Sequence, residues 1–476
     1  MKRRLSINPI TRLEGHGRIE VVLDEKGEVQ RAYLQVPDFK GFEKFCQGRP
    51  AEEMPTITEK ICGVCPTAHH TASSKALDDL FGVKPPVTAK KLRELMYCAF
   101  VFEDHLLHFY FFGGPDFIVG PSASPQRRNI LGVADRLGKD FVKEVMAVRE
   151  KVRSIIGIIG GSALYPVCGL PGGISKPITE SERAQIEDIS EQAIQFALRT
   201  LELFHKTVLD KSRFQEMFKN PAFDLFTYYM GLVDEYNHLN FCDGNLRVVD
   251  PNGDELLRFS GKEYLQHLAE KAESWTYQKS VYLKKIGWKG FTDGPQNGVY
   301  RVGPLGRLNV SEGMPTALAQ SEYDVMYRFY GCKPVNNTMA YHWARLIEAL
   351  YAAERMKELA ADSRVTGTHV RNIPAGKPDN SQGIGVCEAP RGTLIHHYES
   401  DENAILTGVN LLVATQNNAA AISISVDKAA KEFLRDREAL EKNTNMLEMA
   451  FRAYDPCLAC ATHFISKKEN YGTRNP

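Results

Sequence analysis

Alternating apolar and polar residues near the start of the chain predict a β-hairpin over residues 17–37, with its turn at Lys26-Gly27. From about Pro66 the pattern changes, and apolar residues recur every three or four positions, as on the buried face of a helix. This spacing marks a long helix after Pro85-Pro86, between Leu92 and Tyr110. The hairpin is therefore followed by helical chain, and the long helix is expected to be mostly buried.

Later segments continue the helical pattern. Thr179 and Glu182 have the spacing of a capping box, which starts a second long helix with an apolar face that reaches Phe204. Further helical patterns cover residues 136–157, 341–361 and 427–452. Five segments rich in Gly, Pro and Asn lie between the helices, at residues 113–128, 157–177, 237–255, 286–312 and 363–393. The last three of these segments contain short β-like runs. The expected fold class is α+β and helix-dominated, with long buried central helices, an N-terminal β-hairpin region and small peripheral β elements.

The composition is that of a soluble globular protein, because 43% of the 476 residues are hydrophobic and 25% are charged. The 59 basic residues equal the 59 acidic ones, which argues against nucleic acid or an anionic membrane as the main partner. The longest uncharged stretch, Ala404 to Val426, contains Asn410 and Gln416, so we expect it to be buried and not to span a membrane. The chain has no GxGxxG or GxxxxGKS/T motif, and no nucleotide or flavin is expected on it.

Ten cysteines require an explanation. They are too sparse for a disulfide-stabilised secreted protein and the N-terminus has no apolar signal core, so a reducing, cytoplasmic setting is expected. Six stand alone and are expected to be small buried residues: Cys46, Cys98, Cys168, Cys242, Cys332 and Cys387. The other four form two CxxC pairs near opposite ends of the chain, Cys62/Cys65 and Cys457/Cys460.

Each CxxC pair is a potential bidentate clamp for a soft metal, because two intervening residues let both sulfurs face one point. The spacing alone leaves other possibilities open, namely a structural four-cysteine zinc site, a redox-active dithiol and a coincidence of buried cysteines. The long gap between the pairs counts against an ordinary zinc ribbon, whose pairs lie close in sequence. A site shared by both pairs would lie at the centre of the fold.

The sequences around these pairs carry a specific resemblance. Five motifs stand in order: PITRLEGH at residues 9–16, KGFEKF at 40–45, ICGVCPTAHH at 61–70, EAPRG at 388–392 and DPCLACATH at 455–463. In this order they resemble the large, catalytic subunit of nickel-iron hydrogenases, over residues 6–463. Residues 170–177 and 392–398 further resemble the cytoplasmic, bidirectional or cofactor-coupled branch of that family.

The resemblance implies the large-subunit fold as a single unit over residues 1–463, β-rich at about 1–50. It implies reversible heterolytic cleavage of H2 to protons and electrons at a cysteine-ligated Ni-Fe centre, whose iron carries carbon monoxide and cyanide. Electrons are expected to pass to an iron-sulfur small subunit, and then to a flavin, NAD or other acceptor module. The alternatives are a non-catalytic relative of the quinone-site subunit of respiratory complex I, which lacks the four cysteines, and a structural zinc protein.

The same resemblance assigns the ligands and the proton path. All four paired cysteines bind nickel as thiolates, which suit a soft metal. Cys62 and Cys457 are terminal ligands, whereas Cys65 and Cys460 bridge nickel to iron. Cys457 is the first proton acceptor and Glu14 passes the proton onward, a role that requires a carboxyl group whose proton affinity is raised by desolvation.

Residues around the metals are assigned in the same way. Arg391 is expected over their open side, with its direction fixed by Asp104 and Asp455. Pro390, which precedes it, is assigned to cofactor binding, as is Thr415, which matches the position that donates a hydrogen bond to an iron-bound cyanide.

The histidines divide into three groups. His69 is expected to hydrogen-bond to a bridging sulfur, and His396 and His397 are interpreted as structural. His463, together with Glu43, matches a site for magnesium or iron near the C-terminus.

Two features depart from the family pattern. Lys60 stands where an arginine commonly precedes the first CxxC pair. Residues 464–476 follow His463, after which the family's maturation endopeptidase cuts once the nickel-insertion proteins have delivered the metal. This C-terminal extension is therefore expected to be removed on maturation.

Overall fold

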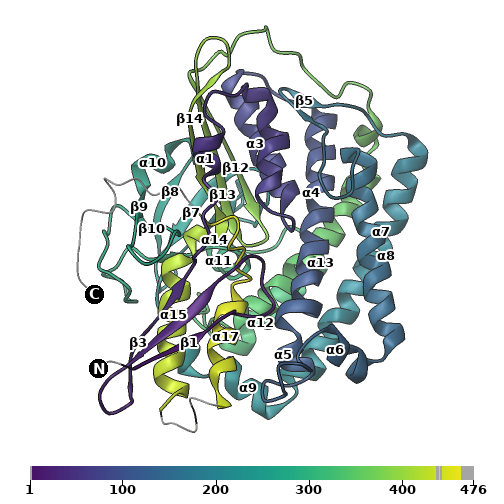
Figure 1. Cartoon of the computed structure of the whole chain (residues 1–476). Coiled ribbons are helices and arrows are strands. Elements are labelled where there is room, and N and C mark those ends of the chain that lie inside the picture. Colours follow the sequence, from purple (N-terminus) through teal and green to yellow (C-terminus); the bar gives the residue numbers. More distant parts are fainter. Residues whose placement is uncertain (1–2, 436–438, 440–441, 463–476) are drawn as a thin grey trace.

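The N-terminal hairpin is present, and it belongs to a three-stranded sheet. The computed structural model describes residues 3–435, 439 and 442–462 (Figure 1). Strands β2 (Arg18–Leu23) and β3 (Val29–Gln35) form the predicted hairpin, and Gly27 in its turn has a φ of 86°. Strand β1 (Arg3–Ile7), which the alternation did not predict, pairs antiparallel with β2.

Long helices form the centre of the molecule, as predicted, and several run side by side in Figure 1. Their bounds are α3 (Pro66–Leu80), α4 (Val87–Leu107), α7 (Lys139–Gly160), α8 (Glu180–Phe204) and α13 (Ala340–Ala361). Helix α13 packs against both α4 and α8, and most of its residues are buried. The capping box of α8 is formed, because Thr179 Oγ1 accepts from Glu182 N at 3.2 Å and the Glu182 carboxylate accepts from Thr179 N at 2.7 Å.

The predicted late β region is an antiparallel sheet of β12 (Gln382–Ala389), β13 (Gly392–Ser400) and β14 (Leu406–Leu412). Strand β12 lies directly on α3, since a Cβ at Gly385 would come within 2.0 Å of the Ala72 carbonyl oxygen. Pro390 and Arg391 form the turn between β12 and β13. This packing places that turn beside the start of α3, where the first CxxC pair lies.

A four-stranded sheet was predicted only in part, because short β-like runs were expected in residues 237–255 and 286–312 but not before residue 237. Its strands are β11 (Tyr300–Arg301), β6 (Tyr228–Val233), β7 (Asn245–Val249) and β8 (Glu255–Phe259), in that order. Every residue of β6 is buried, so the strand lacks the alternation that marks a half-exposed one.

The C-terminal part differs from the prediction in its boundaries. Among the described residues, the helical pattern over 427–452 includes α15 (Ala419–Phe433) and α17 (Thr444–Ala453), and α15 begins earlier than expected. The uncharged stretch 404–426 forms β14, the short α14 (Ala414–Asn417) and most of α15, and it is largely buried, as predicted. Among the described residues, no helix is both long enough and apolar enough to cross a membrane.

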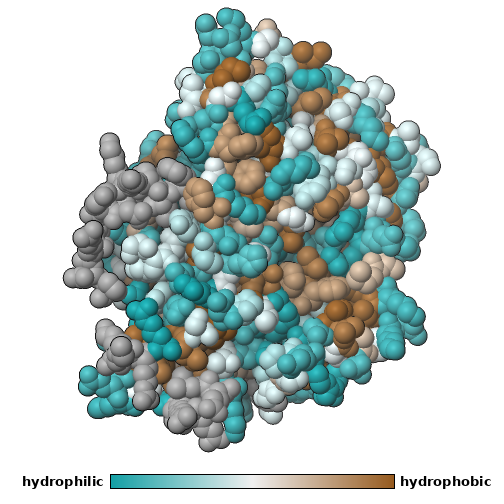
Figure 2. All heavy atoms as spheres, viewed as in Figure 1, coloured by the Kyte–Doolittle hydropathy of each residue, from teal (hydrophilic) through white to brown (hydrophobic). Residues whose placement is uncertain are grey.

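The remaining elements are short and connect these layers. The helices are α1 (Phe42–Phe45), α2 (Met54–Thr58), α5 (Pro115–Ile118), α6 (Ile130–Leu137), α9 (Ser212–Phe218), α10 (Tyr264–His267), α11 (Pro304–Val310) and α12 (Ala317–Tyr330). The strands are β4 (Gly169–Leu170), β5 (Gly173–Ile174), β9 (Leu268–Lys271) and β10 (Ser280–Leu283). Figure 2 shows hydrophobic residues gathered toward the lower right of the drawn face, in the region of α6, where Leu131 is 72% exposed.

The two ends of the described chain meet in the core. The main apolar cluster includes residues from Ile10 to Ala461. Glu14 forms an isolated parallel bridge with Cys457, and the Glu14 carbonyl accepts from Leu458 N at 3.0 Å. The second CxxC pair is thereby brought next to the N-terminal motif.

Candidate metal centre

The four paired cysteines converge on one buried point. Their sulfur atoms all lie within 4.8 Å of one another. The closest Sγ–Sγ distances are 2.8 Å for Cys457–Cys460, 3.2 Å for Cys62–Cys457 and 3.3 Å for Cys65–Cys460. These distances exceed the roughly 2.05 Å of a disulfide bond. Four free sulfurs at one point are a donor set for a soft metal.

The local backbone conformation orients the sulfur atoms of each CxxC pair toward the core. Cys65 is the N-cap residue of α3, and Cys62 precedes it in an extended conformation. The backbone N–H groups of Val64 and Cys65 donate to Cys62 Sγ at 3.2 and 3.4 Å, which favours a thiolate there. The second pair follows α17 through Asp455, whose positive φ of 54° turns the chain back toward the core.

The charge state of the cluster fits a bound cation. Hydrogen bonds from Cys457, Cys460 and Cys65 hold the pKa of Cys62 well below that of an ordinary thiol. Burial raises the pKa of Cys457 and of Cys460 well above the usual value. Thiolates at Cys457 and Cys460 therefore need a positive charge close by, which a bound metal ion would supply.

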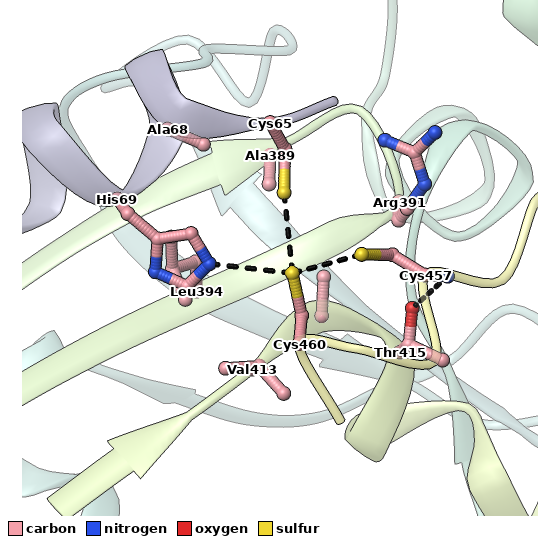
Figure 3. Close-up of a pocket in the computed structure, with 11 residues that line it drawn as sticks. Cys65, Ala68, His69, Ala389, Arg391, Leu394, Val413, Thr415, Cys457 and Cys460 are labelled. Atoms are coloured by element: carbon pink, nitrogen blue, oxygen red, sulfur yellow. Dashed lines mark hydrogen bonds between the residues drawn. The ribbon is translucent and has the colours of Figure 1, made fainter. Parts of the chain in front are cut away.

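A small cavity adjoins the sulfurs (Figure 3). In this view Cys65 and Cys457 point toward Cys460 from two sides, His69 approaches from a third, and Arg391 stands beyond Cys457. Most of the other lining side chains are apolar: Ala68, Ala389, Leu394, Val413 and Ala414. The cavity thus has a polar edge at Arg391 and Thr415 and an apolar wall beside Cys65 and Cys460.

Glu14 contacts the cluster directly. Its Oε2 accepts from Cys457 Sγ at 2.9 Å and from Ala459 N at 3.1 Å. The backbone at Gly15 lies close to that of Ala459, because a Cβ at Gly15, whose φ is 86°, would lie 2.8 Å from Ala459 N. Burial and the nearby Cys62 raise the pKa of Glu14, against the opposing hydrogen bond from Cys457.

Arg391 lies between two buried carboxylates. Its Nη1 donates to Asp104 at 2.8 Å, and its Nη2 lies 3.0 Å from Asp455 Oδ2. Burial opposes the guanidinium charge, but Asp104 and Asp455 outweigh it and raise the pKa of Arg391 further. Burial raises the pKa of Asp104 to about 7. Pro390 lies in the same turn, between the cavity-lining residues Ala389 and Arg391.

The other two residues assigned to cofactor binding also face the cysteines. Thr415, on α14, accepts a hydrogen bond from Cys457 N at 3.0 Å and lines the cavity. His69, one turn into α3, has its Nε2 3.4 Å from Cys460 Sγ. Its other ring nitrogen, Nδ1, lies 3.0 Å from Nε2 of His396, which was predicted to be structural. Nothing in the spacing of His396 indicated this contact.

The predicted second metal site is only partly within the described chain. Glu43 Oε1 accepts from Leu411 N at 3.0 Å, on the strand that leads into α14. His463 lies outside the described residues. The described chain ends at Thr462, which is 7% exposed.

Comparisons with known proteins agree with this geometry. The profile of the family described as nickel-dependent hydrogenase matches residues 40–156 and 267–463, and a HoxL-like profile matches residues 4–39. The iron-sulfur subunit of an F420-non-reducing hydrogenase from Archaeoglobus profundus is 43% identical, over 97% of this chain and 95% of that protein. The NAD-reducing hydrogenase HoxS subunit beta from Cupriavidus necator is 36% identical, over 98% of this chain and 96% of that protein.

Solved structures give the same result. A crystal structure of an NAD+-reducing [NiFe]-hydrogenase in the H2-reduced state superposes with a TM-score of 0.89 at 36% identity, over 97% of this chain and 99% of the other. A Ni-Fe-Se hydrogenase from D. vulgaris Hildenborough, at 22% identity and a TM-score of 0.72, shares the fold over 97% of this chain and 100% of its own. The chain therefore belongs to the nickel-dependent hydrogenase family, as a catalytic large subunit with the predicted α+β fold.

Proposed function

We propose that this subunit cleaves H2 reversibly and heterolytically at a Ni-Fe centre held by Cys62, Cys65, Cys457 and Cys460. When bound, the centre supplies the electron-accepting metals at which H2 is polarised. The observation that carries the proposal is the Glu14 carboxylate 2.9 Å from Cys457 Sγ, inside a buried cluster of four sulfurs. A structural zinc site has no use for a proton-accepting carboxyl group in direct contact with a ligand sulfur.

Cys457 and Glu14 are suited to remove the proton. The Cys457 sulfur is the base next to the metals, and Glu14 is its hydrogen-bonded neighbour. Because burial raises the pKa of Glu14, the carboxyl group takes a proton from the sulfur more readily than an exposed glutamate does. The Ala459 N–H holds the receiving oxygen in place.

Arg391 and Thr415 are suited to the iron side of the centre. Arg391 presents a fixed positive charge to the cavity because Asp104 and Asp455 hold its guanidinium. The Thr415 oxygen accepts from Cys457 N, so its hydroxyl hydrogen is left to donate to an anionic cyanide nitrogen. The apolar wall would contact carbon monoxide, which needs no hydrogen bond. By the resemblance to the family, Cys65 and Cys460 are the proposed bridging ligands, and Cys62 and Cys457 the terminal ones.

A hard cation is proposed near the C-terminus. Glu43 offers a carboxylate beside β14, and the backbone that follows Thr462 carries His463. Carboxylate, imidazole and water suit magnesium, or ferrous iron in its place. Metal analysis after exchange into magnesium-free buffer with a chelator tests this site separately from nickel.

Electrons must leave through another protein, for which we propose an iron-sulfur small subunit followed by a flavin, NAD or other acceptor module. The loop between Cys62 and Cys65 is near the surface, since Gly63 is exposed and the Lys60 side chain is 49% exposed. The Lys60 ammonium lies 3.5 Å from the centre of the Tyr165 ring, and the exposed apolar residues Leu164 and Val167 stand next to Tyr165 and Pro166 in the sequence. A docked partner would cover them.

Maturation and location are proposed on the same basis. We expect residues 464–476 to be removed after His463 once nickel is inserted, which leaves residues 1–463 as one mature unit. The prediction that all six single cysteines are buried is wrong for Cys332, which is exposed, and for Cys242, which is half-buried. Free cysteines, one of them exposed, fit a reducing cytoplasmic setting. Intact-mass measurement of nickel-loaded and nickel-free protein tests the cleavage directly.

The activity is tested by H2-dependent reduction of a dye with the complete complex. Replacing a ligand, Cys457→Ser, should lower the rate at least about 100-fold, because proton transfer and a metal ligand are lost together. The matched control, Cys332→Ser, replaces an exposed single cysteine and should leave the rate unchanged. A Cys457→Ser complex with the rate of the unmodified enzyme would contradict the proposal.

A further inference from the structure

A buried carboxylate joins the two chain segments that carry the proposed proton path. Asp116, on the short helix α5, is 1% exposed, and both of its oxygens accept hydrogen bonds. Its Oδ1 accepts from Arg12 Nη2 at 2.6 Å, and its Oδ2 accepts from Arg452 Nη1. Arg12 stands two residues before Glu14, and Arg452 stands five residues before Cys457. One side chain therefore contacts the approach to each partner of the proton transfer.

Three guanidinium groups surround this one carboxylate. Arg128 Nη1 also donates to Oδ1, at 3.3 Å, and Asn445 Nδ2 donates to the same oxygen at 3.2 Å. Burial opposes the carboxylate charge, but Arg452, Arg12 and Arg128 outweigh it and lower the pKa of Asp116. The carboxyl group is therefore ionised at neutral pH, and its charge holds three cations around one point.

On the N-terminal side, the contact fixes a residue with an uncommon backbone conformation. Arg12 has a φ of 58°, in the left-handed region that a non-glycine residue adopts only where its surroundings hold it there. Its Nη1 donates to the Phe112 carbonyl at 2.8 Å, in the π-helical turn His108–Gly113 that follows α4. Because both ends of the guanidinium are held, the direction in which the chain leaves toward Glu14 is fixed as well.

On the C-terminal side, Arg452 ties helix α17 to the same motif. Its Nε donates to the Thr11 carbonyl at 3.1 Å, and Thr11 Oγ1 donates to Glu448 at 2.8 Å. Arg452 and Glu448 both lie on α17, the helix that precedes the second CxxC pair. The helix before Cys457 and the residues before Glu14 are thus joined to each other and to the central carboxylate.

We propose that Asp116 is a positioning residue that sets the distance between Glu14 and Cys457 for proton transfer. It does so by holding Arg12 and Arg452 at one carboxylate. The inference rests on the proposed function, in which Cys457 Sγ passes a proton to Glu14 Oε2, 2.9 Å away. Proton transfer requires hydrogen-bond distance, and a displacement of about 1 Å can slow a reaction on the order of 100-fold. Among the described residues, Asp116 makes no hydrogen bond to the cysteines, so it acts only through the arginines.

A second carboxylate offers a matched control. Asp78, on α3, accepts from Arg93 and, at 2.7 Å, from Gly172 N, so it also joins separate segments through an arginine. Its side chain is 12% exposed. It stands 13 residues beyond Cys65, the N-cap of α3, which is about 20 Å along a helix. Asp78→Asn therefore removes a comparable carboxylate charge away from the proton path.

The test compares Asp116→Asn, Arg12→Lys and Asp78→Asn in the complete, nickel-loaded complex. The readouts are H2/D2O isotope exchange per nickel and the infrared carbonyl band of protonated Glu14, identified by its absence from Glu14→Gln. Asp116→Asn should lower the exchange about tenfold and shift the band, because the hydrogen bond of Glu14 is displaced. Arg12→Lys keeps the charge but loses the two-pronged contact, and should change both readouts in the same direction by less. Asp78→Asn should change neither.

Two results would overturn the inference. One is unchanged isotope exchange per nickel in Asp116→Asn, or in Arg12→Lys where Asp116→Asn does not assemble. The other is an equal loss of exchange in Asp116→Asn and Asp78→Asn, which would indicate a general loss of packing. Normal exchange in Glu14→Gln would instead contradict the proposed function, because it removes Glu14 from the proton path whatever the effect of Asp116→Asn.

Discussion

At the scale of single residues, Glu14 is the side chain on which proton transfer most depends. Replacing it by glutamine keeps the shape and a hydrogen-bond acceptor but removes the group that ionises. We expect Glu14→Gln to lower H2/D2O isotope exchange at least about 100-fold, the usual contribution of a positioned acid-base group, while nickel content stays unchanged. The control is Glu28→Gln, an exposed glutamate in the N-terminal hairpin. Normal isotope exchange in Glu14→Gln would remove Glu14 from the proton path.

The sequence located those residues whose motifs are unusual, and it missed those whose neighbours come only from folding. Glu14, Arg391 and the paired cysteines stand in ordered motifs, and the structure brings them together. His396 stands at an alternate position of a buried strand, where a histidine is most often structural. Its contact with His69 depends on the packing of β12 and β13 against α3, which residue spacing does not reveal.

At the scale of elements, the start of α8 was predictable because the capping box is a local signal. Thr179→Ala removes the side-chain oxygen that accepts from Glu182 N. It should lower the free energy of unfolding by about 1 kcal/mol, measured by denaturant unfolding of the purified protein. Thr179→Ser keeps the hydroxyl and should retain most of that stability. Equal losses in both variants would show that the cap contributes nothing.

A histidine that links the end of α8 to α12 makes the free energy of unfolding depend on pH. His205, just after α8, has its Nε2 2.6 Å from Glu322 on α12, and this hydrogen bond raises its pKa. The folded state then holds the proton more tightly than the unfolded state, so the stabilisation is present below the unfolded pKa of about 6.5 and lost as pH rises through the folded value.

The His205 side chain is 33% exposed, so solvent limits this contribution to about 1 kcal/mol. His205→Gln should therefore lower the melting temperature more at about pH 6 than at about pH 8. An effect of His205→Gln that is the same at both pH values would contradict this account.

At the scale of the whole molecule, the α+β class and the central helices were predictable, whereas the sheet that contains β6 was predictable only in part. The helices that surround the site carry long apolar patterns, of which α4 and α13 are examples. Strand β6 of that sheet is buried on both faces, and a short apolar run of that kind does not distinguish a strand from a helix segment. The cysteine cluster forms only because the N-terminal motif, α3 and the C-terminal segment meet in one core.

The most direct test of the account is a metal analysis of the purified native complex. Because the four buried sulfurs form one donor set, the account predicts nickel and iron in amounts equal to this subunit, with infrared bands from iron-bound carbon monoxide and cyanide. It also predicts that Cys65→Ser lowers the content of both metals. Stoichiometric zinc, without nickel and without those infrared bands, would contradict the central claim.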